Sequence, residues 1–523
     1  MRQCLKFLVL LITLSIAVSG ASASNVNGIV ISVGTTIFDD SLDPIKGAMS
    51  YGYPFTNAAL LKIAPNSEYI GDMATAWSVS NDALMYSFTL REGVQFSDGS
   101  DFTADDVVFT YETAKANQAF NENVDLTRMA SVLAVGTHTV EFTLSEPYSP
   151  FLDTTAMLGI VPKDSYDSTV FDRYPVGTGP WRVIQYDASQ QIIVEPNPYY
   201  HEGAPSIPRV TLVYMDSEVA LAAAKSGQLD VVMVDPDVAH QIVSGMSMYL
   251  LDTMDIRMMS FPTIPEQTMR GPDGNNIVVG NDVTSDVNVR EALSIGINRQ
   301  KIIQNAFNGV GAPAFGFTDN LIWAFTERSS DSRKEEARTI LEEAGWVLGS
   351  DGIREKDGLR CEFDLLTTDM SRFMLASAVA EDATELGIKM NVRRTNWDEV
   401  GRLKHTTPVV WGWGQYSPTV LQNLFYSDLF LKDSYANVGG YHNPQVDEFV
   451  DRAIDSNTQA GAIGMWKEAQ RVANNDYPYL YIVNIKHPYF ISNGLDISVD
   501  TQIPHPHGHG SPIICNMKDW TLQ

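Results

Sequence analysis

The sequence predicts an α/β protein of two or three domains. The chain has 523 residues, which is more than one compact core usually organises. Strand-like and helix-like stretches alternate along it: the β-branched run RVTLVYM (209–215) precedes the alanine-rich run DSEVALAAAKSGQLD (216–230). The second run begins with acidic residues, stops at Gly227 and leads into DVVMV, so it predicts a helix between two strands. Strand–helix–strand order in several places predicts helices layered on sheets.

Further elements are predicted in both halves of the chain. GIVISVG (28–34) is typical of a strand, and 331–346 is typical of a helix with one apolar face. The Gly-, Asn- and Asp-rich segment 270–286 predicts a loop or short hairpin. We place a lobe boundary shortly before it, at about 255–262. A strand pair predicted at 477–492 has the length to cross back to the first lobe.

The composition indicates a soluble globular protein and argues against a nucleic-acid partner. Hydrophobic residues make up 44% of the chain and charged residues 19%. The 64 acidic residues outnumber the 36 basic ones, which gives a formal net charge of −28. A surface with this charge repels the phosphates of DNA and RNA.

The first residues predict a secretory signal at 1–23. Arg2 and Lys6 precede the apolar run FLVLLITLSIAV (7–18), and Ala21-Ser22-Ala23 supplies a small-residue cleavage site. The alternative is a membrane anchor, but the run is short for a span of about 20 residues. Cys4 precedes the apolar run, so it does not stand where a lipoprotein cysteine would. We therefore expect an extracytoplasmic protein, in the periplasm or cell-surface space, that is soluble after cleavage.

Two cysteines remain in the chain after the predicted cleavage, Cys361 and Cys515. They are able to form one disulfide in an oxidising compartment, but their spacing does not say whether they meet. There is no CxxC pair, which argues against a zinc ribbon or a thioredoxin-type motif.

The common enzyme motifs are absent from the sequence. We find no GxSxG, HExxH, GxxxxGK[ST] or GxGxxG pattern. The paired carboxylates Asp105 and Asp106 are explained by a helix N-terminus, where acidic residues are favourable. The sequence therefore predicts a protein that is not an enzyme and needs no catalytic cofactor.

The most specific pattern in the chain is WSVSNDALMYSFTLREGVQFSDGSDFTADDVVFTYE (77–112). It combines a strand, a turn at Ser97-Asp98-Gly99, and a helix that starts at Thr103 with acidic residues in its first turn. This stretch resembles the signature of the family 5 extracytoplasmic solute-binding proteins, the peptide- and nickel-binding subunits of ABC importers. Other stretches resemble the family in the same order: EPYSPFL (146–152), PVGTGPW (175–181), NPYY (197–200), SGQLDVV (226–232), VREALSIGINRQKI (289–302), EEARTILEEAGW (335–346) and GGYHNPQVDEFVDRA (439–453).

The resemblance implies a two-lobed periplasmic-binding-protein fold of the class II type, with an extra domain inserted in the first lobe. We expect lobe 1 at 24–257 with the inserted domain at about 48–170, lobe 2 at 258–484, and a return to lobe 1 at 485–523. Closure of the lobes around a ligand is then the functional motion. The implied partners are the permease and ATPase subunits of an ABC importer, served by a monomeric receptor.

The stretch VVWGWGQYSPT (409–419) bears on the ligand. Peptide-binding members resemble one another in an aspartate at this place, which pairs with the α-ammonium group of the ligand. Here Gly414 and Gln415 separate Trp413 from Tyr416, and there is no acid. The stretch is more similar to the nickel-binding branch, which implies that Trp413 and Tyr416, and less directly Trp411, line the ligand pocket. The alternative is a buried strand with packed tryptophans.

Further pocket candidates come from lobe 1. Tyr51 and Tyr53 lie where the family presents residues to the ligand, although this stretch is equally compatible with a core position. Some nickel-binding members hold the carboxylates of a metal chelator with arginines of the first lobe. In the corresponding stretches Arg128 is the only arginine.

The tract IPHPHGHGSP (503–512) provides candidate metal ligands, His505, His507 and His509. Other nickel-binding members carry a histidine-bearing loop near the C-terminus that coordinates the metal. A strictly extended tract would spread the three rings over about 13 Å, and Gly508 permits it to curl. Two or three of the histidines would then bind Ni²⁺, with water or an organic chelator such as histidine completing the coordination. The alternatives are an adventitious surface tract and a di-/oligopeptide receptor of the same family.

Overall fold

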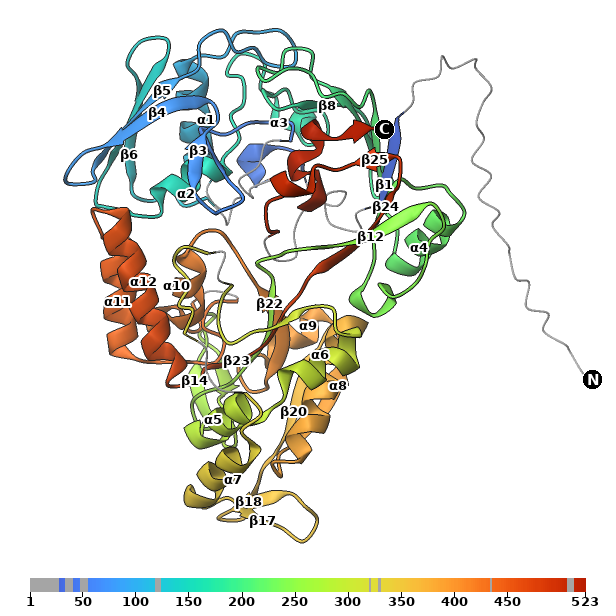
Figure 1. The fold of residues 1–523 in the computed structure, drawn as a ribbon. Coiled ribbons are helices and arrows are strands. Elements are labelled where there is room, and N and C mark those ends of the chain that lie inside the picture. Colours follow the sequence, from blue (N-terminus) through green and yellow to red (C-terminus); the bar gives the residue numbers. More distant parts are fainter. Residues whose placement is uncertain are drawn as a thin grey trace, which may run out of the picture.

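The computed structural model describes residues 28–32, 41–47, 55–117, 124–318, 321–327, 331–432, 435–505 and 512–523. The predicted signal at 1–23 lies outside these residues. Within them, no helix combines the length and apolar character that a membrane crossing requires. The chain forms two lobes, each built around its own β-sheet (Figure 1).

Lobe 1 is organised by a seven-stranded sheet in the order β12-β24-β11-β1-β10-β9-β8. The central strand β1 runs parallel to both of its neighbours, β10 and β11, and α4 connects those two strands. Apolar side chains of α4 cover one face of the sheet, and a second apolar cluster covers the other. The bounds are β1 (Ile29–Ser32), β8 (Trp181–Asp187), β9 (Gln191–Pro196), β10 (Val210–Val213), α4 (Ser217–Lys225), β11 (Val231–Met233), β12 (Met246–Leu251) and β24 (His487–Ser492).

An inserted domain extends lobe 1 with a four-stranded antiparallel sheet in the order β4-β5-β7-β6. Its helix α1 begins after Thr103, as predicted, because the carboxylate of Asp106 accepts the N–H of Thr103 at 2.8 Å. The bounds are η2 (Pro44–Lys46), β2 (Leu61–Ile63), β3 (Tyr69–Gly71), β4 (Ala74–Val79), β5 (Met85–Leu90), α1 (Ala104–Ala116), β6 (Met129–Ala134), β7 (Thr139–Leu144), α2 (Phe151–Met157) and α3 (Ser168–Phe171).

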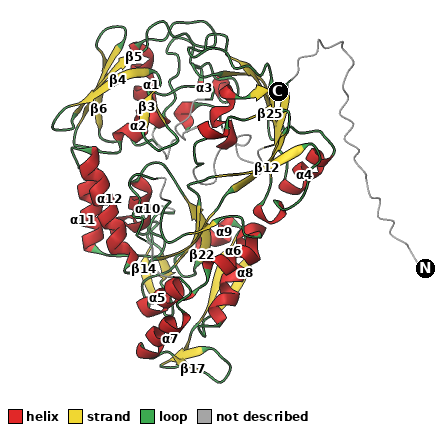
Figure 2. Ribbon diagram, in the orientation of Figure 1, coloured by secondary structure: helices red, strands yellow, loops and turns green. Residues whose placement is uncertain are grey.

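Lobe 2 is organised by a six-stranded sheet in the order β16-β23-β13-β22-β20-β21. Helices α5, α6, α7 and α8 supply the apolar cluster on one face, and α9 lies beside the same strands (Figure 2). The strands are β13 (Ile256–Ser260), β16 (Ala312–Pro313), β20 (Glu362–Thr367), β21 (Lys389–Arg394), β22 (Val409–Trp413) and β23 (Tyr479–Asn484). The helices are α5 (Val287–Gly296), α6 (Arg299–Phe307), α7 (Lys334–Glu343), α8 (Met370–Thr384), α9 (Trp397–Leu403), α10 (Thr419–Phe425), α11 (Pro444–Ile454) and α12 (Gln459–Asn474).

Both lobes also contain short hairpins and 3-10 helices outside the main sheets. The hairpin predicted within 270–286 is formed by β14 and β15 and begins a few residues earlier than expected. The remaining bounds are η4 (Pro236–Val238), β14 (Gln267–Arg270), β15 (Asn276–Val279), β17 (Val347–Leu348), β18 (Arg354–Lys356), β19 (Leu359–Arg360), η5 (Ser427–Leu429), β25 (Leu495–Asp496), η6 (Val499–Thr501), η7 (Pro512–Asp519) and β26 (Thr521–Leu522).

The chain passes between the two sheets twice, from β12 to β13 and from β23 to β24. The two crossings lie side by side: the hydroxyl of Thr253, in the first, donates a hydrogen bond to the carbonyl of Ile485, in the second, at 2.6 Å. The side-chain amide of Asn484 also donates to the carbonyls of Thr253 and Asp255, each at 3.1 Å. These hydrogen bonds pair the two connecting segments, 252–255 and 485–486, which together form the hinge between the lobes.

The two cysteines do not form a disulfide, which settles the alternative that the sequence left open. Cys361 is buried in the core of lobe 2, and Cys515 packs against the apolar cluster of lobe 1. Burial raises the pKa of each thiol to about 12.

Candidate functional site

The carboxyl ends of the parallel strands of lobe 2 meet at the edge of its sheet that adjoins the hinge. Strands β20, β21 and β22 run parallel and lead into α8, α9 and the Trp413 stretch. The antiparallel strand β13 starts at this same edge, directly after the first crossing from lobe 1. In open α/β sheets, ligands bind outside the carboxyl ends of the strands. This edge is therefore the candidate ligand-binding edge of lobe 2.

The corresponding edge of lobe 1 faces it. Strand β11 ends at Met233 and leads to Asp235, at the start of η4. Burial raises the pKa of Asp235, and the negative charges of Asp237 and, from lobe 2, Asp369 raise it further. On this side the lobes also touch, since the side chain of Asn308 donates to the carbonyl of Asp237 at 2.9 Å. The two carboxyl edges thus lie within electrostatic reach of one another.

The predicted pocket residues Trp411 and Trp413 both belong to β22. Their ring centroids lie 6.4 Å apart in an edge-to-face contact. Trp411 is 3% exposed and packs in a small apolar cluster with Val400 and Val438, so the alternative of a buried strand is correct for this residue, and its contact with a ligand stays a prediction. Trp413 is half-buried at the carboxyl end of the strand. The indole N–H of each has no hydrogen-bond acceptor among the described residues.

Aromatic and cationic side chains continue this surface away from β22. The ring of Trp411 lies 6.3 Å from that of Tyr435, which in turn lies 6.3 Å from that of Trp397. The ammonium of Lys404 is 4.4 Å from the centre of the Tyr435 ring, and the guanidinium of Arg372 is 5.4 Å from the centre of the Trp397 ring. Such cation–ring contacts are attractive. Tyr435 and Trp397 are each more than a third exposed, so part of the surface is open to solvent.

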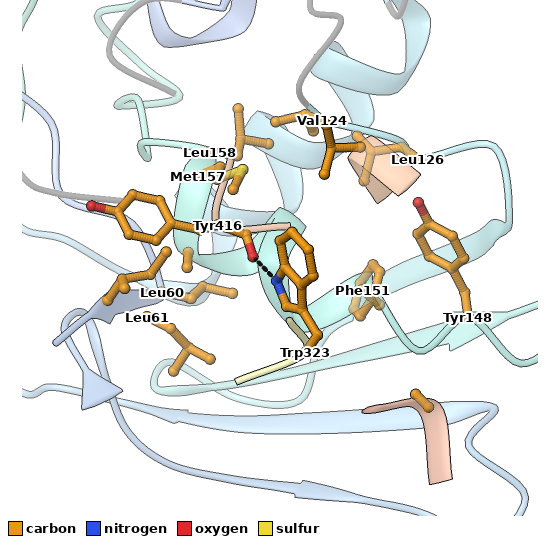
Figure 3. Packing of buried hydrophobic residues seen from close by; sticks show 14 of the residues in the cluster. Leu60, Leu61, Val124, Leu126, Tyr148, Phe151, Met157, Leu158, Trp323 and Tyr416 are labelled. Atoms are coloured by element: carbon orange, nitrogen blue, oxygen red, sulfur yellow. Dashed lines mark hydrogen bonds between the residues drawn. The ribbon is translucent and has the colours of Figure 1, made fainter. Parts of the chain in front are cut away.

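Tyr416 lies where the two lobes are in contact. Its hydroxyl donates a hydrogen bond to the carbonyl of Pro504, and its own carbonyl accepts the indole N–H of Trp323 at 2.6 Å. Figure 3 shows Tyr416 and Trp323, both of lobe 2, among Leu60, Phe151 and other apolar residues of the inserted domain. Tyr416, Trp323 and the inserted domain therefore meet in one continuous apolar cluster.

A buried carboxylate bridges the lobes beside this cluster. Asp153, in α2 of the inserted domain, accepts hydrogen bonds from the hydroxyl of Tyr69 and, across the lobes, from the hydroxyl of Ser417 at 3.1 Å. Burial raises the pKa of Asp153 to about 6, although both hydrogen bonds lower it. This carboxylate therefore titrates close to neutral pH.

The first of the three predicted metal ligands lies at the hinge. His505 is buried, and its backbone joins the first crossing through a bridge with Thr253 and a 2.7 Å hydrogen bond from Met254 N–H to the His505 carbonyl. Its ring lies 5.3 Å from the ring of His487, which is also buried at the start of β24. His507 and His509 lie outside the described residues. Within the described residues, no group of three or more His, Cys, Asp or Glu side chains is arranged to hold a metal.

The remaining predicted pocket residues are in lobe 1. Tyr51 and Tyr53 lie outside the described residues. The guanidinium of Arg128 contacts the Pro147 carbonyl and lies 2.6 Å from a carboxylate oxygen of Asp455, at the end of α11. Arg128 therefore ties the inserted domain to lobe 2, and its role toward a ligand stays a prediction.

Sequence reasoning missed three residues at this site: Arg257, Arg372 and His487. Arginines were sought in lobe 1, whereas Arg257 and Arg372 lie in lobe 2 beside the carboxyl edge. Arg372 follows the N-cap Asp369 of α8, shortly after the end of β20. The only signal in the sequence was an aspartate that caps a helix after an apolar run. Nothing in the sequence around His487 marks it, because its neighbour His505 is brought to it only by the fold.

Comparison with known proteins identifies the same architecture elsewhere. Residues 68–437 match the family described as bacterial extracellular solute-binding proteins, family 5 Middle. Protein XP55 of Streptomyces lividans is 31% identical over 502 residues, 92% of this chain and 88% of that protein. The oligopeptide-binding protein AppA of Bacillus subtilis is 25% identical over 429 residues, 76% of this chain and 75% of that protein.

Solved structures share this fold at low sequence identity. The structure of NikZ from Campylobacter jejuni in complex with Ni(L-His) is 21% identical, with a TM-score of 0.77 over 94% of this chain and 99% of that chain. The structure of AppA from Bacillus subtilis in complex with a nonapeptide is 20% identical, with a TM-score of 0.68 over 95% and 98% of the two chains. These likenesses confirm the two-lobed fold. The first of the two structures contains Ni(L-His) and the second contains a nonapeptide.

Proposed function

This chain belongs to the bacterial extracellular solute-binding proteins of family 5, and we propose that it captures nickel between its two lobes and delivers it to the permease of an ABC importer. The family consists of receptors, not enzymes, and its members work with ABC permease and ATPase subunits. The proposed cargo is Ni²⁺, free or as a chelate with a small molecule such as histidine. A receptor of this kind closes its lobes around the cargo before delivery.

The place of His505 is the observation that carries this proposal. The first histidine of the HxHxH tract lies at the hinge, beside the ring of His487 and next to the residue that Tyr416 contacts. Neutral imidazole nitrogen suits Ni, Cu and Zn, and the affinity order alone does not separate these metals. A metal bound by this tract would lie beside both crossings, because the backbone of His505 pairs with the first crossing and its ring lies beside His487, directly after the second. Binding there would be coupled to closure.

A di-/oligopeptide receptor is the second candidate. It is favoured by the likeness to AppA, which is named for oligopeptides. Against it stands the stretch between Trp413 and Tyr416, which has Gly414 and Gln415 in place of an acid. A peptide α-ammonium buried without a carboxylate partner would lose several kcal/mol.

Native mass spectrometry with metal analysis tests the proposal on protein purified without an affinity tag. The wild type is compared with a tract variant, His505→Ala/His507→Ala/His509→Ala. The control variant, His138→Ala/His240→Ala/His442→Ala, removes the same number of imidazoles outside the tract. We expect one nickel per chain in the wild type and the control, and none in the tract variant. Metal-free protein that carries peptide masses, unchanged in the tract variant, would establish the peptide receptor instead.

A further inference from the structure

The C-terminal end of α11, in lobe 2, is capped by residues of lobe 1. The last carbonyls of a helix have no N–H partner within the helix, so they need donors from outside it. Ser149 of the inserted domain supplies two such donors. Its N–H donates to the carbonyl of Ile454 and its hydroxyl donates to the carbonyl of Ala453, each at 2.8 Å. The helix end is therefore capped from a place 304 positions away in the sequence, in the other lobe.

The guanidinium of Arg128 lies at the same helix end. It is 2.6 Å from a carboxylate oxygen of Asp455, the residue that directly follows α11. Contacts within the inserted domain hold it there: it donates to the Pro147 carbonyl and lies 5.6 Å from the centre of the Tyr148 ring. Because the C-terminus of a helix carries a partial negative charge, a guanidinium is favourable at this place. Ser149 and Arg128 together form an interlobe cap on α11.

A further contact lies beside the interlobe cap. The side-chain amide of Asn457, which follows α11, donates to the carbonyl of Asn81, in the turn between β4 and β5, at 3.3 Å. The groups that meet here are polar and reach solvent: the side chain of Arg128 is 27% exposed and that of Asp455 is 57% exposed. Such groups exchange a protein partner for water at a small cost. These contacts can therefore form and break while both lobes stay folded.

We propose that the interlobe cap is a latch for the closed state: Ser149 and Arg128 engage the end of α11 when the lobes close and leave it when the lobes open. Figure 1 shows α11 below the inserted domain, on the opposite side of the molecule from α4. Each opening breaks two hydrogen bonds and one ion pair, so the cap shifts the equilibrium toward the closed form through contacts between the lobes. This inference rests on the proposed capture of a ligand between the lobes, but not on which ligand is bound.

Disulfide trapping tests the latch on ligand-free protein. The variant Asn81→Cys/Asn457→Cys places two thiols at the exposed positions beside the interlobe cap. The native Cys361 and Cys515 compete little, because burial raises the pKa of each thiol. The rate of disulfide formation with oxidised glutathione then reports how often the lobes meet at this place. Mass spectrometry after blocking of the free thiols measures that rate.

Substitutions in this two-cysteine background weaken the latch. We expect Arg128→Gln/Ser149→Ala to slow trapping about fivefold, since it removes an exposed ion pair and a hydroxyl donor. Arg128→Lys keeps the charge and should retain most of the rate. The control Arg452→Gln should retain all of it, because Arg452 lies in the last turn of α11 and pairs with Glu448 of the same helix. Equal trapping rates in Arg128→Gln/Ser149→Ala and in its background would overturn the proposal.

Small-angle X-ray scattering connects trapping with closure. We expect the trapped protein to have a smaller radius of gyration than the reduced form that carries Arg128→Gln/Ser149→Ala. Equal radii would mean that the interlobe cap does not accompany closure, and they would also overturn the proposal. Because neither measurement contains a ligand, failure of the latch is seen here, whereas failure of nickel capture is seen only in the metal analysis.

Discussion

The hydroxyl of Tyr416 donates a hydrogen bond to the carbonyl of Pro504, the residue directly before His505. This contact joins the Trp-Gly-Trp stretch of lobe 2 to the histidine tract across 88 positions of sequence. The predicted pocket and the predicted metal tract are therefore neighbours in the fold. Since the tract also pairs with the first crossing, a chain of contacts runs from Tyr416 through Pro504 and His505 to the hinge.

Replacing Tyr416 by Phe tests the energetic value of this contact. The variant keeps the ring and leaves the Pro504 carbonyl without the phenolic donor, so we expect a loss of about 1 kcal/mol in the free energy of unfolding. Urea denaturation of Tyr416→Phe against the wild type measures it. Tyr174→Phe removes the hydroxyl of an exposed tyrosine and should cost much less. Equal effects of the two substitutions would contradict the prediction.

Trp323 should stabilise the contact between the lobes. It is 2% exposed, its ring packs edge-to-face on Phe317 at 5.1 Å, and it lies in the cluster that spans both lobes (Figure 3). We expect Trp323→Ala to lower the free energy of unfolding by about 3–5 kcal/mol. Trp323→Phe keeps an aromatic ring but loses the N–H donated to Tyr416, so its loss should be smaller. Chemical denaturation compares the two, and an alanine variant as stable as the phenylalanine variant would show that the ring is not needed there.

Local signals predicted elements well because they depend on neighbouring residues. The start of α1 after Thr103 and the end of α4 before Gly227 follow from capping and glycine, which act within one turn of helix. The two-lobed fold followed from motifs spread in order along the chain. The alternatives for the β22 tryptophans were not exclusive, since Trp411 is buried in a core and also lies on the candidate ligand-binding edge.

Long-range neighbours could not be predicted from the sequence. His487 and His505 meet because a crossing strand and a returning segment converge at the hinge, and no local pattern encodes that convergence. Arg257 and Arg372 come from different elements, β13 and α8, whose approach depends on the strand order of the sheet. Pairing of Asp153 with Ser417 depends in the same way on how the lobes close.

His487 should contribute to metal binding if the tract holds nickel. Its ring lies 5.3 Å from that of His505, a spacing that allows two imidazoles to share one ion. We expect His487→Ala to weaken nickel binding by about tenfold or more, and the exposed control His240→Ala to leave it unchanged. Because ligation needs neutral imidazole, wild-type affinity should also fall as the pH drops below about 6.5. Nickel titration followed by calorimetry at several pH values measures both effects, and unchanged affinity in His487→Ala would remove this residue from the site.

Asp153 should make the stability of the protein depend on pH. Its pKa in the folded protein is about 6, above the ordinary value of 3.8, so the folded state binds its proton more tightly than the unfolded chain does. Its favourable contribution is therefore complete below pH 3.8 and is lost as the pH rises through about 6. Asp153→Asn cannot titrate, so we expect the difference in the free energy of unfolding, wild type minus variant, to fall by up to about 3 kcal/mol between pH 4 and pH 7.

The free energy of unfolding of the wild type must be compared with that of Asp153→Asn at each pH, because other groups change the stability in the opposite direction. Burial lowers the pKa of His201 to about 4, and this group favours the folded state as the pH rises. Such contributions cancel when wild type and Asp153→Asn are unfolded by urea at the same series of pH values. Glu343→Gln, which removes an exposed carboxylate of α7, serves as the control and should run parallel to the wild type. If the curve of Asp153→Asn also runs parallel, Asp153 is ionised in the same way in the folded and unfolded states, and it cannot act as a pH-sensitive contact between the lobes.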